Sequence, residues 1–561
     1  MGRLGGSIVK WSGSDRLLVI LLIYAFFHIL TFNTIFRALL VTSALPLGLL
    51  AKFDEPNILI IFSDDHALRT ISAYAKESGV NQTPNIDRLA NEGAIFTRSF
   101  CGNSICQPSR ASILTGKHSH KHGVMTNGSN WDPEQPIFTR MLSEAGYQTA
   151  MIGKWHMHPY PSDEFDYHKT LTGHGGQGRY YNPHFVTYEG DTVMERGYST
   201  DIITTESIEW MQGRDASKPF LMMCQFKSPH TNVMPPLRNL NLFKDGDIPV
   251  PDSYHSDHSG RSRYLSKTWM QMSGMKSEDV IKTGPEAGTY DLPAGEMQKE
   301  RAQRIGLPGF YAYMTEEELA QWHAHYDPIN EEYARRLAEG EVSQKEQDEF
   351  PYQRYMKDYL RCVAAIDQNV GRLLEYLEKS GLDNNTIVIY SSDQGFFLGE
   401  NGFTDKRLAD DVTMSMPFLI RWPGVVASGQ RIDAMVQNID YAPTLLDVAG
   451  IEVPADMDGK SLLPILKGHK PDEWRDSIYY HYYHNGAYNL PKIEAARSDR
   501  YKLVRYYDHK KFDFGEQWEL FDLQKDPTEQ QSVYANPEYA SILEEMQHEL
   551  SKLRDQYEVV D

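Results

Sequence analysis

Two acidic pairs stand directly after apolar runs that have the character of buried strands. Asp64 and Asp65 follow the run NILIIFS, and a second pair, Asp393 and Gln394, follows the run TIVIYSS. The carboxyl ends of parallel strands meet at one edge of a sheet, so we expect these side chains to converge. Their hard oxygen atoms suit Ca²⁺ better than Zn²⁺. Mg²⁺ is possible but is less suited to a site built from protein ligands alone. The alternative is that each pair merely caps a helix.

Four cysteines are too few for a disulfide scaffold in a chain of 561 residues. Cys224 lies in the apolar run PFLMMCQF, which predicts a buried thiol. Cys106 is expected in a polar loop, which makes it the cysteine to examine for chemistry. The disulfide state of Cys101, Cys224 and Cys362 stays open at this stage.

Residues 106–116 read Cys-Gln-Pro-Ser-Arg-Ala-Ser-Ile-Leu-Thr-Gly. This run matches the signature C-x-P-S-R-x-x-x-L-T-G, and from about residue 57 to its tail the chain resembles the type I sulfatases of the alkaline phosphatase superfamily. The wording DQGFFLGE is similar to that of exported bacterial polysaccharide sulfatases. The other matching runs are Gly-Lys-Trp-His at 153–156, Ser-Pro-His at 228–230, Ser-Asp-Gln-Gly at 392–395, Lys406 after Gly402, and LFDLQKDP at 520–527.

The resemblance implies that a maturation enzyme converts Cys106 to formylglycine (3-oxoalanine). The hydrated aldehyde has two hydroxyls on one carbon. One hydroxyl attacks sulfur and expels the alcohol, and the other drives elimination of sulfate as the aldehyde reforms. A plain Ser or Cys nucleophile would instead leave a sulfated enzyme that is itself hard to hydrolyse.

Roles for the other matching residues also follow from the resemblance. A calcium ion would act as electrophile and template, and its implied ligands are Asp64, Asp65, Cys106, Asp393 and Gln394. Lys154 and Lys406 are expected to hold the sulfuryl oxygens, and Arg110 is expected beside the hydrate. His156 is implied as the base for elimination. His230 is implied as an acid or hydrogen-bond donor to the leaving oxygen that also contacts the sulfate.

Some positions depart from the family pattern. Gln394 stands where many relatives have Asn or His, and its amide oxygen is still expected to ligate calcium. Asn401 stands where relatives often have His, which puts any role of that position in doubt. Thr231 and Asn232 follow the Pro-His pair where other relatives carry Pro or His, so the leaving-group side is expected to differ.

A histidine-rich run, Lys-His-Ser-His-Lys-His, occupies residues 117–122. Such a run invites interpretation as a transition-metal site. Because relatives have a similar His-bearing loop after the nucleophile motif, we favour a basic loop that supports substrate binding.

The elements that must position these residues alternate between strands and helices. Apolar runs predict buried strands at 57–63, 148–152, 220–226, 386–391 and 417–421, and helical patterns occupy 84–93 and 355–380. This alternation predicts an α/β fold: a large, mostly parallel sheet sandwiched by helices, resembling alkaline phosphatase. Strand-like segments at 477–483 and 501–507 and a helix at 537–554 predict a smaller C-terminal α+β subdomain.

We therefore predict three parts of the chain. Residues 1–52 form a signal peptide or membrane anchor, residues 53–460 form the catalytic domain, and residues 461–561 form the C-terminal subdomain. The polar stretch 238–350, with a helix at 315–337, is interpreted as a variable insertion. Its two alternatives are a wall of the substrate site and a surface elaboration far from it.

The N-terminus carries the one membrane signal of the sequence. Arg3, Lys10 and Arg16 precede an apolar stretch at 17–36, which is long enough to span a bilayer. Positive charge before the stretch places the rest of the chain outside the cytoplasm. We expect a periplasmic, cell-surface or secreted body, whether the segment is cleaved or retained as an anchor.

Composition excludes some functions and leaves others open. The formal net charge of −21 argues against a nucleic-acid binder. A phosphoryl-transfer enzyme of the same superfamily, such as a phosphatase or phosphoethanolamine transferase, is one alternative to a sulfatase, and an inactive glycan-binding homologue is another. We expect the substrate to be a sulfated polysaccharide or oligosaccharide rather than a small aryl ester. Algal glycans such as ulvan and animal glycosaminoglycans are both candidates.

Overall fold

The computed structural model describes residues 55–75, 80–173, 175–275, 280, 282 and 309–560. The predicted signal or anchor at 1–52 and the centre of the predicted insertion lie outside these ranges. None of the helices in the described ranges combines the length and the apolar character needed to cross a bilayer.

A ten-stranded mixed sheet forms the centre of the catalytic part, in the order β13-β2-β12-β9-β1-β8-β4-β5-β6-β7. Its five middle strands, from β9 to β5, run parallel. Strand β12 was predicted as one of the buried strands, and it pairs antiparallel with β9. The bounds are β13 Gln430–Ile432, β2 Ala94–Phe96, β12 Phe418–Arg421, β9 Thr386–Ser392, β1 Asn57–Ser63, β8 Phe220–Gln225, β4 Gln148–Gly153, β5 Tyr167–Thr172, β6 His184–Thr187 and β7 Thr192–Met194.

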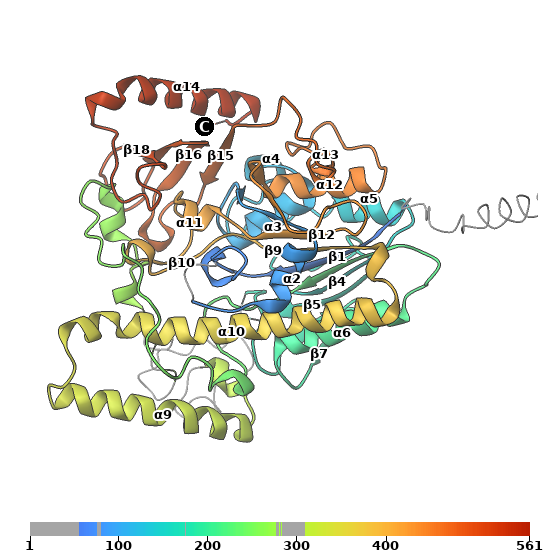
Figure 1. The fold of residues 1–561 in the computed structure, drawn as a ribbon, viewed down its shortest axis with the longest axis horizontal. Coiled ribbons are helices and arrows are strands. Elements are labelled where there is room, and N and C mark those ends of the chain that lie inside the picture. The colour runs from blue at the N-terminus through green and yellow to red at the C-terminus, as the bar shows by residue number, and fades with distance from the viewer. Residues whose placement is uncertain are drawn as a thin grey trace, which may run out of the picture. The chain divides into compact units, whose positions relative to one another are not determined.

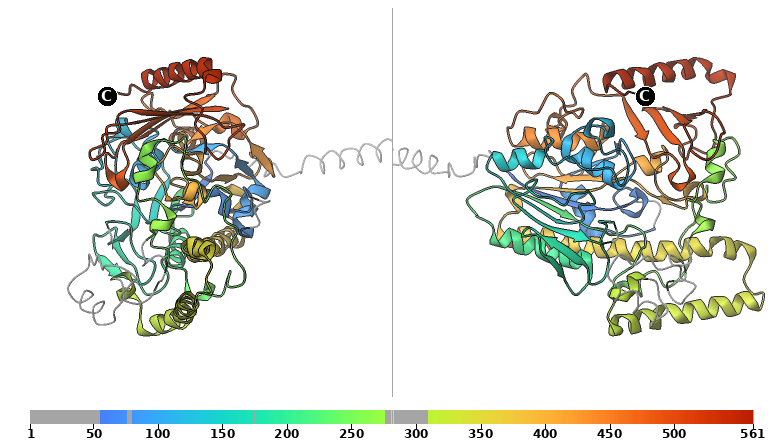
Figure 2. Two further views of the ribbon diagram at one scale, coloured as in Figure 1. Left: turned by 90° about the vertical axis from the view of Figure 1, so that its left-hand side faces the viewer. Right: turned by 180° about the vertical axis from the view of Figure 1, so that it is seen from behind.

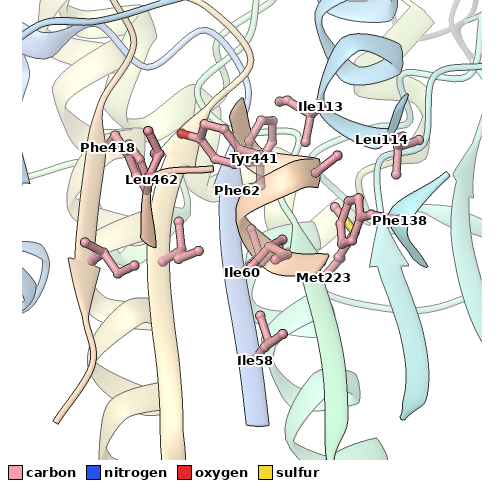
Figure 3. Close-up of a cluster of buried hydrophobic side chains, with 14 of the residues drawn as sticks. Ile58, Ile60, Phe62, Ile113, Leu114, Phe138, Met223, Phe418, Tyr441 and Leu462 are labelled. Atoms are coloured by element: carbon pink, nitrogen blue, oxygen red, sulfur yellow. The ribbon is translucent and has the colours of Figure 1, made fainter. Parts of the chain in front are cut away.

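Strand β1 is apolar throughout because both of its faces are buried. Ile58, Ile60 and Phe62 point into one hydrophobic layer (Figure 3), and Leu59 and Ile61 point into the other. Successive side chains of a strand alternate between its faces. A strand that is covered on both sides is therefore apolar on both faces. This confirms the predicted doubly covered sheet.

Helices cover the two faces of the sheet (Figure 1). Helices α2 (Pro84–Glu92) and α6 (Ser199–Gly213) each pack against α10 (Gln344–Ser380) on one face. Helices α3 (Cys106–Thr115), α5 (Phe138–Glu144) and α12 (Tyr441–Val448) cover the other. The fold is therefore the predicted α/β sandwich.

Helix α10 begins earlier than the sequence pattern indicated. It was expected from residue 355 but starts at Gln344, inside the stretch interpreted as an insertion. Pro351 lies inside the helix and weakens the sequence signal for its first turns. Helix α9 (Glu316–Ala338) runs beside this extension (Figure 2), and Tyr326 donates a hydrogen bond of 2.7 Å to Asp358.

The C-terminal subdomain is a four-stranded antiparallel sheet in the order β15-β16-β17-β18. Helix α14 (Ala540–Gln556) packs on one face of this sheet, as Figure 2 shows. The other face joins a hydrophobic cluster with side chains of the catalytic part, among them Phe397 and Phe403. The strand bounds are β15 Ser477–Tyr482, β16 Lys492–Ser498, β17 Tyr501–Tyr507 and β18 Gln517–Asp522.

Partly buried ion pairs connect this subdomain to the loop that follows the short strand β11 (Thr404–Asp405). Lys502 of β17 and Arg497 of β16 each approach Asp411 to 2.8 Å. The Tyr480 hydroxyl donates a hydrogen bond of 2.6 Å to the Arg407 carbonyl. Because the Tyr480 contact is buried and the ion pairs are partly buried, they fix the loop against the sheet.

We expect Gly153→Ala to destabilise the fold severely. Gly153 ends β4 with φ +117°, and an added Cβ would lie 1.8 Å from the Gln225 carbonyl oxygen. The collision and the strained φ should together lower the free energy of unfolding by about 2 kcal/mol or more, measured by urea denaturation. Gly213→Ala is the matched control because its Cβ would meet nothing within 4 Å. Equal midpoints for the two variants would contradict the predicted close approach.

Candidate active site

The two acidic pairs lie side by side at the carboxyl ends of β1 and β9. The strands pair in register with Ser63 opposite Ser392, so the residues that follow them are neighbours. The Asp65 amide donates a hydrogen bond of 3.1 Å to Asp393 Oδ1. Asp64, Asp65, Asp393 and Gln394 are all fully buried. A helix-capping role does not describe this arrangement, because the carboxylates face one another across the strand ends.

Cys106 is the first residue of α3 and faces the same carboxylates, so the expectation of a polar loop was wrong. All ten residues of the helix are buried. The Cys106 Sγ lies 3.3 Å from Asp64 Oδ1 and 3.9 Å from Asp65 Oδ1. Burial and the Asp64 charge raise the pKa of the thiol well above its usual value. The unmodified side chain is therefore a neutral thiol and a poor nucleophile.

Arg110 lies one turn after Cys106 and links three elements. Its Nε donates to Asp393 Oδ2 at 3.1 Å. Its Nη1 donates to the Lys154 carbonyl at 2.8 Å and to Gln225 Oε1 at 2.5 Å. Its Nη2 has no hydrogen-bond partner among the described atoms. The planar guanidinium thus sets the distance between the strand ends.

Two buried lysines neutralise the charges of two of the carboxylates. Lys154 directly follows β4 and forms an ion pair with Asp64, and Lys406 directly follows β11 and forms an ion pair with Asp65. Although burial opposes ionisation, the Lys154 and Arg110 charges hold the pKa of Asp64 well below its usual value. Burial, opposed by Lys406 and reinforced by Asp64, raises the pKa of Asp65 to about 7.

Both candidate histidines are neutral in this environment. Burial, reinforced by Lys154, lowers the pKa of His156 well below its usual value. For His230, burial outweighs the opposing effect of Asp64 and has the same result. The His230 Nδ1 donates to the Thr231 carbonyl, which leaves Nε2 facing Asp65 Oδ2 at 3.7 Å.

The backbone is strained at two of the site residues. His156 has a φ of 61° and Asp65 a φ of 65°. This region is costly for residues other than glycine and is common at functional sites.

The structure adds three residues to the predicted set. Gln225 accepts the Arg110 hydrogen bond, and the Tyr359 hydroxyl donates to the Asp65 carbonyl at 2.5 Å. Lys227 carries a buried Nζ without a hydrogen-bond partner among the described atoms. Burial and the Lys154 charge lower the pKa of Lys227 to about 7. Only Lys227 had a sequence signal, because it immediately precedes the Ser-Pro-His run.

The residues present fit a hard cation. One ligand atom from each of Asp64, Asp65, Cys106 and His230 lies within 4.8 Å of the others. Asp393 adds a third carboxylate beside them. The Gln394 Oε1 is buried and has no hydrogen-bond donor among the described atoms, as expected of an oxygen that binds a cation. Carboxylate and amide oxygens are donors that Ca²⁺ prefers.

A cavity of about 370 Å³ opens onto this centre. Asp65, His230 and Lys406 line it, so it reaches the buried charges. Trp269, Gly274 and Met275 from the predicted insertion also line it, which supports the interpretation of that stretch as a wall of the substrate site. The remaining lining comes from two asparagines, Gln177, Thr231, residues 404–407 and the C-terminal residues His484, Ala487 and Tyr488, together with Ile105.

The histidine-rich run does not line this cavity. The His120 Nε2 donates to the Tyr557 carbonyl at 2.8 Å, and Lys121 pairs with Asp458 at 2.8 Å. His122 Nε2 lies 3.0 Å from the Ser112 hydroxyl. The run therefore joins the catalytic part to the C-terminal subdomain, and the prediction that it supports substrate binding was wrong. Asn401 is also outside the lining and donates from Nδ2 to the Thr528 carbonyl at 3.1 Å.

The fold and the site define an alkaline phosphatase-like hydrolase of the sulfatase class. Residues 56–451 match the family model described as sulfatase, which covers more than half of the chain. Residues 399–556 match the model described as N-sulphoglucosamine sulphohydrolase, C-terminal. The chain belongs to the sulfatase family, and the protein is a sulfatase.

Its relatives include enzymes that act on glycans. A protein of Bacteroides thetaiotaomicron named N-acetylglucosamine-6-O-sulfatase is 40% identical over 512 residues, which cover 90% of this chain and 87% of the relative. A solved structure of a protein in complex with its substrate D-glucosamine-2-N,6-O-disulfate superposes with a TM-score of 0.83 at 38% identity, covering 90% of this chain and 99% of that one. An ulvan-active sulfatase of Formosa agariphila is 25% identical, with coverage of 89% and 81%.

We expect Arg110→Lys to destabilise the protein strongly. A lysine cannot serve Asp393, Gln225 and the Lys154 carbonyl together, so a buried carboxylate loses its partner. The free energy of unfolding should fall by about 3 kcal/mol or more, measured by urea denaturation. Arg372→Lys is the matched control because Arg372 is exposed on α10, and its effect should be small. A loss no larger than that of the control would show that Arg110 does not hold the strand ends together.

Proposed function

We propose that this sulfatase hydrolyses a sulfate ester on a glucosamine unit of a sulfated oligosaccharide or polysaccharide. The proposal depends on one observation: a cavity whose lining includes Lys406 reaches Asp65, the neighbour of Cys106. Its volume lies in the range of about 300–1,000 Å³ typical of small-ligand sites. The 40% identical relative named for N-acetylglucosamine supports glucosamine as the sugar. So does the solved structure that holds a glucosamine disulfate.

Glucosamine is better supported than the algal substrate considered from the sequence. The ulvan-active relative is 25% identical, whereas the relative named for N-acetylglucosamine is 40% identical over a similar share of the chain. Specificity depends on the residues that line the site, and these diverge as overall identity falls. An ulvan oligosaccharide therefore serves as the comparison substrate in the experiment below.

The nucleophile is proposed to arise from Cys106. When converted to formylglycine and hydrated, this residue supplies an oxygen nucleophile that attacks sulfur. The first turn of α3 aims the side chain at Asp64 and Asp65, and the neutral thiol of the unmodified residue is unsuited to the attack. Arg110 keeps the helix and the carboxylates in register.

A calcium ion is proposed to be held by Asp64, Asp65, Asp393 and Gln394, with residue 106 beside them. When bound, the ion supplies Lewis-acid stabilisation of the sulfate charge and a template for the reacting groups. The orphaned Gln394 oxygen and the three facing carboxylates support this assignment.

Lys154 and Lys406 are proposed to stabilise the sulfuryl oxygens. Both ammonium groups are buried and are already fixed by carboxylates, so little reorganisation is needed when charge develops. Lys154 follows β4 and Lys406 follows β11, so the two positive charges near residue 106 come from different elements of the fold.

The histidines are proposed to move protons. His156 is neutral and its Nδ1 has no hydrogen-bond partner among the described atoms, so it can accept a proton in the elimination step. His230 directs Nε2 into the cavity, where an anionic ester would favour its protonated form. From there it can donate a hydrogen bond or a proton to the leaving oxygen and contact the sulfate.

Two further proposals concern the maturation and the export of the protein. A maturation enzyme that recognises residues 106–116 is proposed as a transient partner. The apolar stretch at 17–36 is proposed to direct export to the periplasm, the cell surface or the medium, with membrane association if it is retained.

Mass spectrometry tests the nucleophile. The peptide containing residue 106 of active protein should be lighter by about 18 Da than its cysteine form, because the side chain loses sulfur and two hydrogens and gains one oxygen. The peptide containing Cys224 should keep its cysteine mass and is the internal control. Active protein with an unmodified thiol at position 106 would contradict the mechanism.

Sulfate release tests the function. The matured enzyme should free sulfate from 6-O-sulfated N-acetylglucosamine faster than from a sulfated ulvan oligosaccharide, measured by ion chromatography. Cys106→Ala should abolish release. Lys406→Met should lower kcat/KM by about 100-fold or more, because a fixed cation at the sulfuryl group is lost.

Controls separate the site from general damage. Lys345→Met removes an exposed ammonium on α10 and should leave the rate unchanged. A chelator should stop the reaction, and Ca²⁺ should restore it. Turnover of a small aryl sulfate with no release from any glycan would overturn the proposed substrate class.

A further inference from the structure

Trp269 has the one exposed indole among the tryptophans of the described ranges, with 68% of the residue accessible. It lies in the lining of the catalytic cavity. A single exposed apolar side chain is common on protein surfaces and means little by itself. The position of this one, at the opening of a cavity that ends at buried catalytic groups, is what calls for a function.

The backbone that carries Trp269 is fixed on both sides. The Trp269 amide donates to the Tyr488 carbonyl at 3.2 Å, and the Thr268 hydroxyl donates to the same oxygen at 3.0 Å. On the other side, Met270 is fully buried and its carbonyl accepts a hydrogen bond of 2.7 Å from Thr404. The indole is therefore held on a rigid support, which lowers the entropy cost of using it in binding.

The cavity is divided between charged and apolar lining. Lys406 and Asp65 are buried at its inner end, where the sulfate ester must be cleaved. Trp269 is accessible, so it lies at the outer end. A sugar ring carries apolar C–H groups on its faces, and such a face packs well against an aromatic ring. A sugar linked to the sulfated unit would extend outward from the inner end, toward the indole.

We propose that Trp269 is a stacking platform for the sugar adjoining the sulfated unit, which makes the enzyme favour oligosaccharides over monosaccharides. This inference rests on the proposed glycan-sulfatase function and extends it to a second sugar-binding subsite. The role is binding of a neighbouring sugar, not chemistry at sulfur, so it acts on KM for longer substrates.

Kinetics on substrates of different length test the platform. The substrates are a sulfated glucosamine monosaccharide, a tetrasaccharide with the same sulfated unit, and a small aryl sulfate. Trp269→Ala should raise KM for the tetrasaccharide by about fivefold to tenfold with kcat unchanged. The monosaccharide and the aryl sulfate should show no change. Trp269→Phe keeps a ring and should retain most of the affinity.

Tyr188→Ala is the matched control, because Tyr188 is 51% exposed and does not line the cavity. It should behave as wild type on all three substrates. Binding gives a second measurement: tetrasaccharide added to a Cys106→Ala protein should change the tryptophan fluorescence, and this change should disappear with Trp269→Phe.

The outcomes separate the two proposals. An equal loss on all substrates would assign Trp269 a structural role, and no selective loss on the tetrasaccharide would exclude stacking. Either result overturns the platform while the glycan-sulfatase function stands. If the wild-type enzyme cleaves the aryl sulfate and no glycan, the proposed function fails and the platform fails with it.

Discussion

Three carboxylates buried at the ends of two neighbouring strands impose the main constraint on this structure. Charges removed from water are costly unless each finds a partner of opposite sign. Asp393 is paired with Arg110, Asp64 with Lys154 and Asp65 with Lys406. The three cations come from a helix, a strand end and a loop after a short hairpin, so charge balance alone requires these elements to meet at one point. Of these cations, Lys406 lines the cavity and faces any anion that enters it.

The surrounding layers hold this arrangement from several directions. The Ser109 hydroxyl donates to the Asp393 carbonyl and accepts a 2.8 Å hydrogen bond from Asn438. Tyr359, on the helix of the opposite layer, fixes the Asp65 carbonyl. Both layers therefore contact the backbone that carries the metal-binding candidates. Buried polar groups cost little stability when each of them has a hydrogen-bond partner. Such hydrogen bonds also specify one geometry.

The sequence predicted those features whose signals are local. The strands before Asp64 and Asp393 are continuous apolar runs ended by acids, and the signature at 106–116 is contiguous. The start of α3 was missed because Ile105 offers no capping side chain and because the helix buries polar residues whose partners are distant in sequence. The cavity wall was only partly predictable for a similar reason: Trp269 and Tyr488 meet through backbone hydrogen bonds that leave no pattern in residue types. The predicted helix at 355–380 was too short because Pro351 is a local signal against a helix. In the structure, tertiary packing outweighs that signal and α10 continues through Pro351.

The loop that carries Lys406 is anchored at its far end by side chains of the C-terminal sheet. Asp411 is held by Lys502 and Arg497, and the Arg407 carbonyl by Tyr480. The position of the Lys406 ammonium is thus set by a subdomain that holds none of the three buried carboxylates. Sequence changes in that sheet can therefore shift Lys406 while helix α3 stays unaltered. A chimera of two homologues would keep this geometry only if the loop after β11 and the C-terminal sheet came from the same parent.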